Sequence, residues 1–252
     1  MNTPANWWRT FFSGPFVDFW LAATTDRQTE QEADFIEQSL RVSAPAKLLD
    51  VPCGGGRHCR ALSKRGFEMT GVDISAGFLE AARADSTAGP GNITFEQREM
   101  VDLPWRERFQ GAFSFGNSFA YLDDEGNAAF LKAVSDAVEP GSSFVLETGY
   151  VSDALLPVLQ ERSWYELGDM IVLSKRCYDP ATSRLHVEYT LIRGSAIDRQ
   201  SMSARLYSYR ELLGLFAEAG FTKVEGYGSL DREPFKLGSR NLFLVGTKPG
   251  KP

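Results

Sequence analysis

The chain is 252 residues long and 43% hydrophobic, which fits one globular domain with a sizeable core and room for an embellishment. Its formal net charge of −6 provides no overall basic field for a phosphate backbone, so nucleic acid is disfavoured as a partner.

The cysteines and the apolar runs bear on the cellular compartment. Cys53, Cys59 and Cys177 form no paired disulfide framework, and Cys53 and Cys59 with His58 lack a zinc-binding spacing, so we expect free thiols and no metal. No run of eighteen apolar residues occurs, and charged residues interrupt the first aromatic run, which argues against a signal peptide. The sequence therefore predicts a soluble, cytoplasmic protein with no membrane segment, either a monomer or a homodimer.

Residues 1–40 open with an unusually aromatic run, W-W-R-T-F-F-S-G-P-F-V-D-F-W, and continue as a polar helical pattern through Phe35, Ile36 and Leu40. Ordinary core packing, or an interface, explains such a run on frequency alone.

The stretch from Lys47 to His58, K-L-L-D-V-P-C-G-G-G-R-H, predicts a strand, a tight glycine turn and the start of a helix. Such a turn lets the backbone approach a ligand and places free N–H groups and the positive end of a helix dipole beside it. Asp50 precedes the turn, where a carboxylate would repel a pyrophosphate but suits a cationic ligand. The next apolar run, Phe67 to Val72, ends in Asp73, an acid that can accept both hydroxyls of a ribose.

Strands and helices alternate from here, which predicts a parallel sheet with helices on both faces and a ligand at the carboxyl ends of the strands. Gly66 and Ser75 supply a helix end and a helix start, and a Ser/Gly/Pro turn occupies residues 86–91. The predicted elements are a helix at Cys59–Arg65, a strand ending at Asp73, a helix at Ala76–Ala84, strands at Ile93–Met100 and Gly111–Gly116, a helix from Asp123 to Val138 and a strand at Ser143–Glu147.

Residues 161–207 change in character. Two alternating runs, M-I-V-L-S-K-R-C-Y and L-H-V-E-Y-T-L-I, are joined by D-P-A-T-S, which predicts an antiparallel hairpin inserted into the sheet domain. Ser208 and Glu211 then form a capping-box pattern for a helix from Tyr209 to Ala219. Two further runs predict the last strands, at Phe221–Tyr227 and Leu242–Thr247.

The motifs D-V-P-C-G-G-G-R-H and G-V-D-I-S resemble the first two motifs of class I S-adenosylmethionine-dependent methyltransferases. The likeness continues at Glu99-Met100, at G-N-S-F-A-Y-L and at Pro140-Gly141, so it covers residues 45–150. It implies a doubly wound, Rossmann-like α/β sheet of seven strands with an antiparallel last strand. It also implies S-adenosyl-L-methionine as cofactor and S-adenosyl-L-homocysteine as product.

The resemblance also implies cofactor contacts residue by residue. Asp73 would hold the ribose hydroxyls, and Glu99, followed by Met100, would accept a hydrogen bond from the adenine amine. Asp102 is an alternative acid for that contact. The full set implied for the cofactor is Asp50, Cys53, Gly54, Gly56, Asp73, Ile74, Glu99, Met100 and Phe115.

The motif G-N-S-F is similar to that of small-amine N-methyltransferases of the glycine N-methyltransferase type, in which the Asn meets the acceptor. Asn117 could therefore offer its amide oxygen to an acceptor N–H or O–H, or it could cap the following turn. Those enzymes carry an arginine near the tip of the fifth strand for an amino-acid carboxylate. This chain has none there, which puts an amino-acid acceptor in doubt.

In the same family the N-terminal helices fold over the cofactor as a lid. We therefore expect Phe12 and Trp20 of the lid to face the sulfonium with aromatic rings, and Tyr150 to lie where the acceptor binds. His186, on the second run of the hairpin, is a candidate general base, and the alternative is a histidine on a solvated strand face.

Three units are predicted. Residues 1–40 form a helical lid, residues 41–160 and 208–252 form the cofactor-binding domain, and residues 161–207 form a wall on the acceptor side.

These features predict methyl transfer from S-adenosylmethionine to a small-molecule acceptor, with nitrogen favoured over oxygen and carbon. A sulfonium is already a good leaving group, so the protein mainly has to align the reactants and exclude water. A nicotinamide-dependent oxidoreductase shares the strand, turn and helix, but Asp50 and the antiparallel final strands count against it. A protein that binds the cofactor without catalysis is a further alternative.

Overall fold

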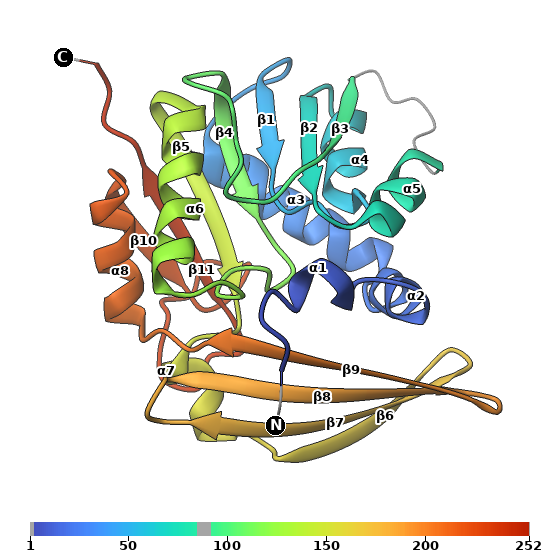
Figure 1. The fold of residues 1–252 in the computed structure, drawn as a ribbon. Helices are drawn as coiled ribbons and strands as arrows, with labels where there is room; N and C mark the ends of the chain where they lie inside the picture. The colour runs from blue at the N-terminus through green and yellow to red at the C-terminus, as the bar shows by residue number, and fades with distance from the viewer. Residues whose placement is uncertain (1–2, 85–91, 252) are drawn as a thin grey trace.

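The computed structural model describes residues 3–84 and 92–251, so the turn expected at residues 86–91 lies outside the described residues. The larger sheet has seven strands in the order β10-β11-β5-β4-β1-β2-β3 (Figure 1). β11 is antiparallel to both of its neighbours, whereas β1 to β5 pair in parallel, which confirms the predicted doubly wound sheet. The strands are β1 (Lys47–Asp50), β2 (Glu68–Asp73), β3 (Ile93–Gln97), β4 (Phe109–Ser114), β5 (Val138–Thr148), β10 (Thr222–Tyr227) and β11 (Leu242–Thr247).

Helices cover both faces of this sheet because neighbouring strand residues point to opposite sides. On β4, Ala112 packs into the core shared with α6 and α8, and Phe113 packs into the core shared with α3 and α4. Figure 1 shows these two helical layers on either side of the strands. The helices of the two layers are α3 (Asp26–Leu40), α4 (Arg57–Lys64) and α5 (Ala76–Ala84) on one face, and α6 (Asp124–Ala137) and α8 (Tyr209–Glu218) on the other.

Helix starts follow the expected capping chemistry. Ser208 and Glu211 form the predicted capping box at α8, and Asp123 accepts a hydrogen bond from the backbone N–H of Gly126 at 2.8 Å at the start of α6. β5 begins directly after α6, at Val138, and is therefore longer than predicted. None of the helices in the described part of the chain is both long and apolar enough to cross a membrane.

The insertion is a four-stranded antiparallel sheet in the order β6-β7-β8-β9, where the sequence predicted only the central hairpin β7–β8. The flanking strands were missed because they carry mostly polar or exposed residues, with Met202 and Ala204 of β9 among the few that are buried. Their connection to β5 includes α7 (Ser152–Leu155) and a 3₁₀ turn (Leu156–Val158). The strands are β6 (Arg162–Leu167), β7 (Met170–Asp179), β8 (Arg184–Arg193) and β9 (Ala196–Arg205).

Two short N-terminal helices lie between the two sheets (Figure 1). They are α1 (Trp8–Phe11) and α2 (Pro15–Ala22), and their aromatic residues share a core with the inner face of the four-stranded sheet. α3 instead packs on the large sheet, through Phe35 and Ile36. The part of residues 1–40 that overhangs the carboxyl ends of the large sheet is therefore α1 and α2, which we call the lid. The core that the lid shares with the four-stranded sheet is the lid core.

Candidate functional site

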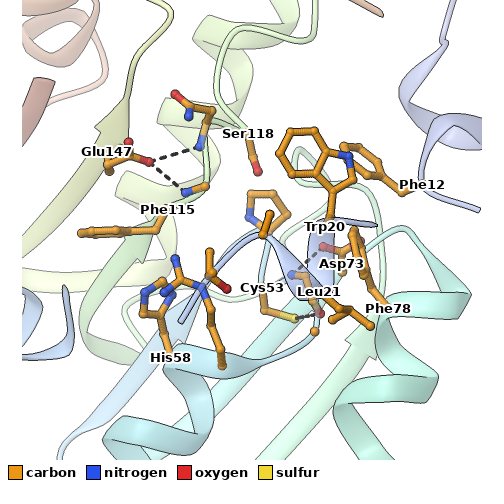
Figure 2. Close-up of a pocket in the computed structure, with 18 of the residues that line it drawn as sticks. Phe12, Trp20, Leu21, Cys53, His58, Asp73, Phe78, Phe115, Ser118 and Glu147 are labelled. Atoms are coloured by element: carbon orange, nitrogen blue, oxygen red, sulfur yellow. Dashed lines mark hydrogen bonds between the residues drawn. The ribbon is translucent and has the colours of Figure 1, made fainter. Parts of the chain in front are cut away.

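A cavity of about 430 Å³ lies at the carboxyl ends of the parallel strands, beneath the lid. Its volume is within the range of small-molecule sites. The turns after β1, β2, β3 and β4 and the end of β5 all contribute to its wall. Figure 2 shows Cys53, Asp73, Phe115 and Glu147 from four of these strand ends around a common space. Of the residues expected to touch a cofactor, those that line the cavity are Cys53, Gly54, Asp73, Ile74, Glu99, Met100 and Phe115.

The glycine turn after β1 forms one side of the cavity. Gly54 and Gly56 have φ angles of +52° and +73°, a left-handed conformation that glycine adopts without strain. Gly54 and Gly55 line the cavity, but Gly56 lies behind them as the N-cap of α4, where an added Cβ would come within 2.7 Å of Phe95. Gly56 thus shapes the turn from behind the cavity wall, where we had expected a contact.

Asp73 ends β2 and lies against the glycine turn. Its two carboxylate oxygens accept backbone hydrogen bonds from Gly54 and Ser75, each at 2.8 Å. Burial raises its pKa to about 6, although the backbone donors favour the ionised form. Each oxygen keeps a further acceptor position, so Asp73 can take both hydroxyls of a ribose.

Glu99 follows β3 and is held by the lid. The indole N–H of Trp8 donates to Oε2 at 3.4 Å, and an Arg9 guanidinium nitrogen lies 2.6 Å from Oε1. The alternative acid, Asp102, is exposed, pairs with Arg98 at 3.4 Å and is not part of the cavity wall. The geometry therefore favours Glu99 for an adenine contact.

Asp50 is not where we expected it. The side chain is buried behind the turn, outside the cavity wall, and its Oδ2 accepts a hydrogen bond from the thiol of Cys59 at 3.3 Å. Burial raises its pKa to about 8. A carboxyl enclosed in this way does not contact a ligand in the cavity.

Glu147, near the end of β5, is an acid in the cavity wall that the sequence reasoning missed. Only 4% of it is exposed, and it accepts hydrogen bonds from the backbone N–H groups of Gly116 at 2.9 Å and Asn117 at 3.2 Å (Figure 2). Asn241 donates to its other oxygen at 2.7 Å. Burial and the charge of Glu32 raise its pKa to about 7, against the effect of the backbone donors. Like Asp73, it follows a buried apolar run, and that signal could have identified it.

Asn117 lines the cavity beside Glu147 and has a left-handed backbone, with φ of +60°, which Asn tolerates. Its side-chain oxygen accepts a hydrogen bond from the backbone N–H of Gly149. This bond ties the turn after β4 to the turn after β5. The amide oxygen thus has a structural partner in the turn after β5. One of its two expected roles was to cap the turn that follows Asn117 itself.

A charged cluster lies on the far side of the glycine turn from Asp73. Arg57 Nη1 is 2.5 Å from Glu32 Oε2, and His58 Nε2 is 2.8 Å from the same oxygen. Burial alone would raise the pKa of Glu32, but His58 and Arg57 together lower it to about 2. Burial lowers the pKa of His58 to about 4, so the histidine is neutral at pH 7 and the ion pair is Arg57 with Glu32.

The aromatic residues of the N-terminus divide between the core and the cavity. Core packing and a lid over the cavity, the two alternatives for this run, each apply to some of them. Phe11, Phe16 and Phe19 pack against the four-stranded sheet. Trp8, Phe12 and Trp20 line the cavity, where Phe12 lies 5.4 Å from Phe78 and 6.1 Å from Tyr121, measured between ring centroids.

Two expected acceptor-side residues lie outside the cavity wall. Tyr150 packs beside Tyr121 and directs its hydroxyl to the sulfur of Met202 at 3.5 Å. His186 alternates with Leu185 and Val187, which face the lid core, so it points to the opposite face of β8. Strand geometry therefore excludes His186 as a base for a ligand in this cavity.

Comparison with known proteins agrees with this geometry. Residues 48–141 match a family model described as a methyltransferase domain. A S-adenosylmethionine-dependent methyltransferase from Clostridium acetobutylicum ATCC 824 has the same fold, with a TM-score of 0.76, 15% identity and coverage of 94% of this chain and 97% of that one. The chain therefore carries a methyltransferase domain and has the fold of S-adenosylmethionine-dependent methyltransferases. The methyltransferase CcbJ from Streptomyces caelestis is also similar to this methyltransferase, with a TM-score of 0.80, 20% identity and coverage of 96% and 99%. A glycine/sarcosine N-methyltransferase from Halorhodospira halochloris is 26% identical over 222 residues, which are 84% of this chain and 80% of that protein.

The cavity wall of the methyltransferase fits its cofactor. Asp73 is buried yet keeps acceptor positions for two ribose hydroxyls, and Glu99 offers a carboxylate for an amine. Trp20 adds a buried indole N–H that has no hydrogen-bond partner among the described residues. The matched family model ends at residue 141, before Glu147, so it covers the cofactor side of the cavity and leaves the acceptor side to structural argument.

Proposed function

We propose that this methyltransferase methylates the nitrogen of a small amine that binds between Glu147 and the lid. The observation that carries the proposal is the buried carboxyl of Glu147 in the cavity wall, on β5, which three strands separate from β3 and the proposed adenine contact Glu99. An aliphatic amine is a cation at neutral pH, and a charge-assisted hydrogen bond to a carboxylate is its strongest simple contact. The aromatic rings of the lid add a favourable surface for a cation.

The bound cofactor supplies a methyl group activated by a positively charged sulfur. Asp73 and Glu99 would fix the adenosine end, and the aromatic lid would exclude water from the reacting atoms. Glu147 would hold the acceptor ammonium and accept its proton, which frees the nitrogen lone pair for attack. A carboxyl with a pKa raised to about 7 suits this role, because a base works best when its pKa lies near the working pH.

Asn117 would then act mainly by position. Its side-chain oxygen holds Gly149, and its backbone N–H donates to Glu147, so it fixes the carboxyl that meets the acceptor. In this assignment the amide oxygen of Asn117 does not contact the acceptor, and Asn117 instead orients Glu147.

The glycine/sarcosine N-methyltransferase of Halorhodospira halochloris supports nitrogen as the acceptor atom. Its similarity extends over 84% of this chain and therefore beyond the stretch of residues 48–141 that the methyltransferase-domain model matches.

The proposal is tested by supplying S-adenosylmethionine with small primary amines and with the matching alcohols, and measuring release of S-adenosylhomocysteine. We expect turnover of amines, and Glu147→Gln should lower kcat/KM by about 10²- to 10⁴-fold, the range for loss of a general base. S-adenosylhomocysteine affinity, measured by calorimetry, should stay within about threefold, because Glu147 faces the acceptor.

Glu188→Gln is the matched control, since Glu188 lies on the outer face of the four-stranded sheet. Methylation of alcohols without amines, or a Glu147→Gln enzyme as active as Glu188→Gln, would contradict the proposal.

A further inference from the structure

The two faces of the four-stranded sheet differ in exposure. On β7, Met170 and Val172 are buried in the lid core. Ile171 and Leu173 point to the opposite side and are 40% and 39% exposed. Figure 1 shows this sheet at the lower edge of the molecule, with the lid above it. We infer that the opposite side, the outer face, binds a second copy of the chain and forms a homodimer.

The outer face carries four large apolar side chains that lie next to one another. Strand register places Trp164 of β6 opposite Leu173 of β7, and Trp164 is 67% exposed. Ile171, two residues before Leu173, lies opposite Ile192 of β8. Side chains of cross-strand partners are in contact, so these four residues form one apolar patch. A contiguous patch with an exposed tryptophan is typical of a protein–protein interface.

Charges beside the apolar patch make the outer face complementary to itself. Lys175 of β7 lies opposite Glu188 of β8, with 3.9 Å between Nζ and Oε2, and their side chains are 55% and 43% exposed. A two-fold axis that runs along the strands, between β7 and β8, would place each β7 over the β8 of the other copy. Lys175 then faces Glu188 of the partner subunit, and Glu188 faces Lys175 of the partner subunit. Both contacts join unlike charges.

The same axis matches the other side chains of the outer face. Ile171 faces Ile192 of the partner subunit, so apolar surface covers apolar surface. Arg199 of β9 is exposed and lies in the same row across the sheet as Trp164. Trp164 therefore faces Arg199 of the partner subunit, and an indole ring attracts a guanidinium. A second copy fits better than an unrelated protein, because the face supplies both halves of each contact.

The outer face has the area that a homodimer needs. It consists of three strands of ten residues and one of six. At about 3.4 Å per residue and about 4.8 Å between strands, these cover roughly 600 Å². Two copies would together bury about 1,200 Å², which is at the lower end of the range for specific interfaces. We therefore expect a dimer of micromolar affinity that dissociates on dilution.

Sedimentation velocity of the full chain over a range of concentrations tests the inference. The wild type should dimerise, and Ile171→Asp should raise the dissociation constant by at least about 100-fold, because it buries an unpaired carboxylate in an apolar contact. Leu237→Asp is the matched control and should leave the dimer intact, since Leu237 is 73% exposed in the loop before β11. A wild type that stays monomeric up to millimolar concentration, or a dimer that survives Ile171→Asp, would overturn the inference.

Exchange of the two charges tests the interface without a change in its apolar patch, and it serves also if Ile171→Asp does not fold. Lys175→Glu and Glu188→Lys should each weaken the dimer by about 10-fold, because like charges then meet across the interface. The double variant Lys175→Glu/Glu188→Lys should dimerise as the wild type does. Single variants with wild-type dimerisation would contradict the proposed axis.

Cross-linking distinguishes this arrangement from other dimers. Glu166 of β6 and Ile197 of β9 lie at the rim of the outer face, where substitution has little effect on affinity. In a Cys177→Ser background, which removes the exposed native thiol, a short bismaleimide should join Glu166→Cys protein to Ile197→Cys protein when the two are mixed. Neither protein alone should cross-link, because the axis keeps the two copies of each strand apart.

Cross-linking of either protein alone, or none in the mixture, would exclude the placement of β7 over the β8 of the other copy. Every residue changed in these experiments lies outside the cavity wall. The variants should therefore bind S-adenosylhomocysteine as the wild type does. The outcome is independent of the amine proposal, since no acceptor enters any of the measurements.

Discussion

Glu147→Gln should change how the stability of the methyltransferase depends on pH. The pKa of Glu147 rises from 4.5 to about 7 on folding because the side chain is buried. Between these two pH values the folded protein keeps a proton that the unfolded chain has released. Protonation therefore favours the folded state, and the free energy of unfolding must fall as the pH rises through this window. Glutamine does not titrate, so the variant lacks this loss.

The size of the effect follows from the shift in pKa. A change from 4.5 to about 7 corresponds to roughly 3 kcal/mol of unfolding free energy between pH 4 and pH 8. The substitution has a second effect, since one end of the glutamine amide donates where Glu147 accepts from Gly116, Asn117 or Asn241. That mismatch costs about 1–3 kcal/mol at every pH. The pH dependence of the difference between the two proteins therefore isolates the titration of Glu147.

Urea unfolding of both proteins at several pH values from 4 to 8 measures this difference. The free energy of unfolding of the variant, relative to that of the wild type, should rise with pH. The rise should be roughly 3 kcal/mol over the range, with most of it between pH 4.5 and 7. Asp50 and Asp73 also have raised pKa values, about 8 and about 6, but they titrate in both proteins and cancel. Two stability curves that run parallel across the range would refute the reasoning.

Three further substitutions, the last of them with an exposed control, test the cavity wall and the lid core. Gly56→Ala should lower the free energy of unfolding by about 1–3 kcal/mol in urea, because φ is +73° and the new Cβ would press on Phe95. Asp73→Asn should weaken the binding of S-adenosylhomocysteine by about 10-fold or more in calorimetry, because an amide can accept from only part of the donors that meet this carboxylate. Unchanged affinity would exclude the ribose contact. Leu191→Ala, 2% exposed in the lid core, should cost about 2–5 kcal/mol of unfolding free energy, whereas Ile197→Ala, 54% exposed, should change it little; similar losses would contradict the assigned packing.

The large sheet could be predicted because its signals are local. An apolar run followed by glycines or by an acid marks the carboxyl end of each strand, so Asp73 and Glu99 could be assigned to the ligand edge from short stretches of sequence. Burial of Asp50 could not be read in this way, because a strand residue next to the turn faces either the cavity or the core, and only the packing of Cys59 against it decides.

Residues brought together from distant parts of the chain escaped prediction. Glu32 contacts Arg57 only because α3 packs beside α4, and no local sequence pattern predicts which helices pack together. Glu147 carried a usable signal, but its importance depends on Asn241, which arrives from the far end of the chain. Strand alternation predicts that His186 shares a face with Glu188, away from Leu185, but which of the two faces meets the lid depends on the aromatic residues of α1 and α2.

The four-stranded sheet acts on the site through the lid. Phe11 packs against Tyr189 of β8, with 6.0 Å between ring centroids, while its neighbour Phe12 turns to the cavity. Trp7 donates to the backbone oxygen of Ser203 on β9 at 3.0 Å, and Ser75, two residues after Asp73, donates to the backbone oxygen of Phe12 at 2.8 Å. The lid is therefore bonded to the small sheet on one side and to the turn after β2 on the other. No residue of β6 to β9 lines the cavity, so the small sheet holds the lid over the cavity without forming any part of the cavity wall.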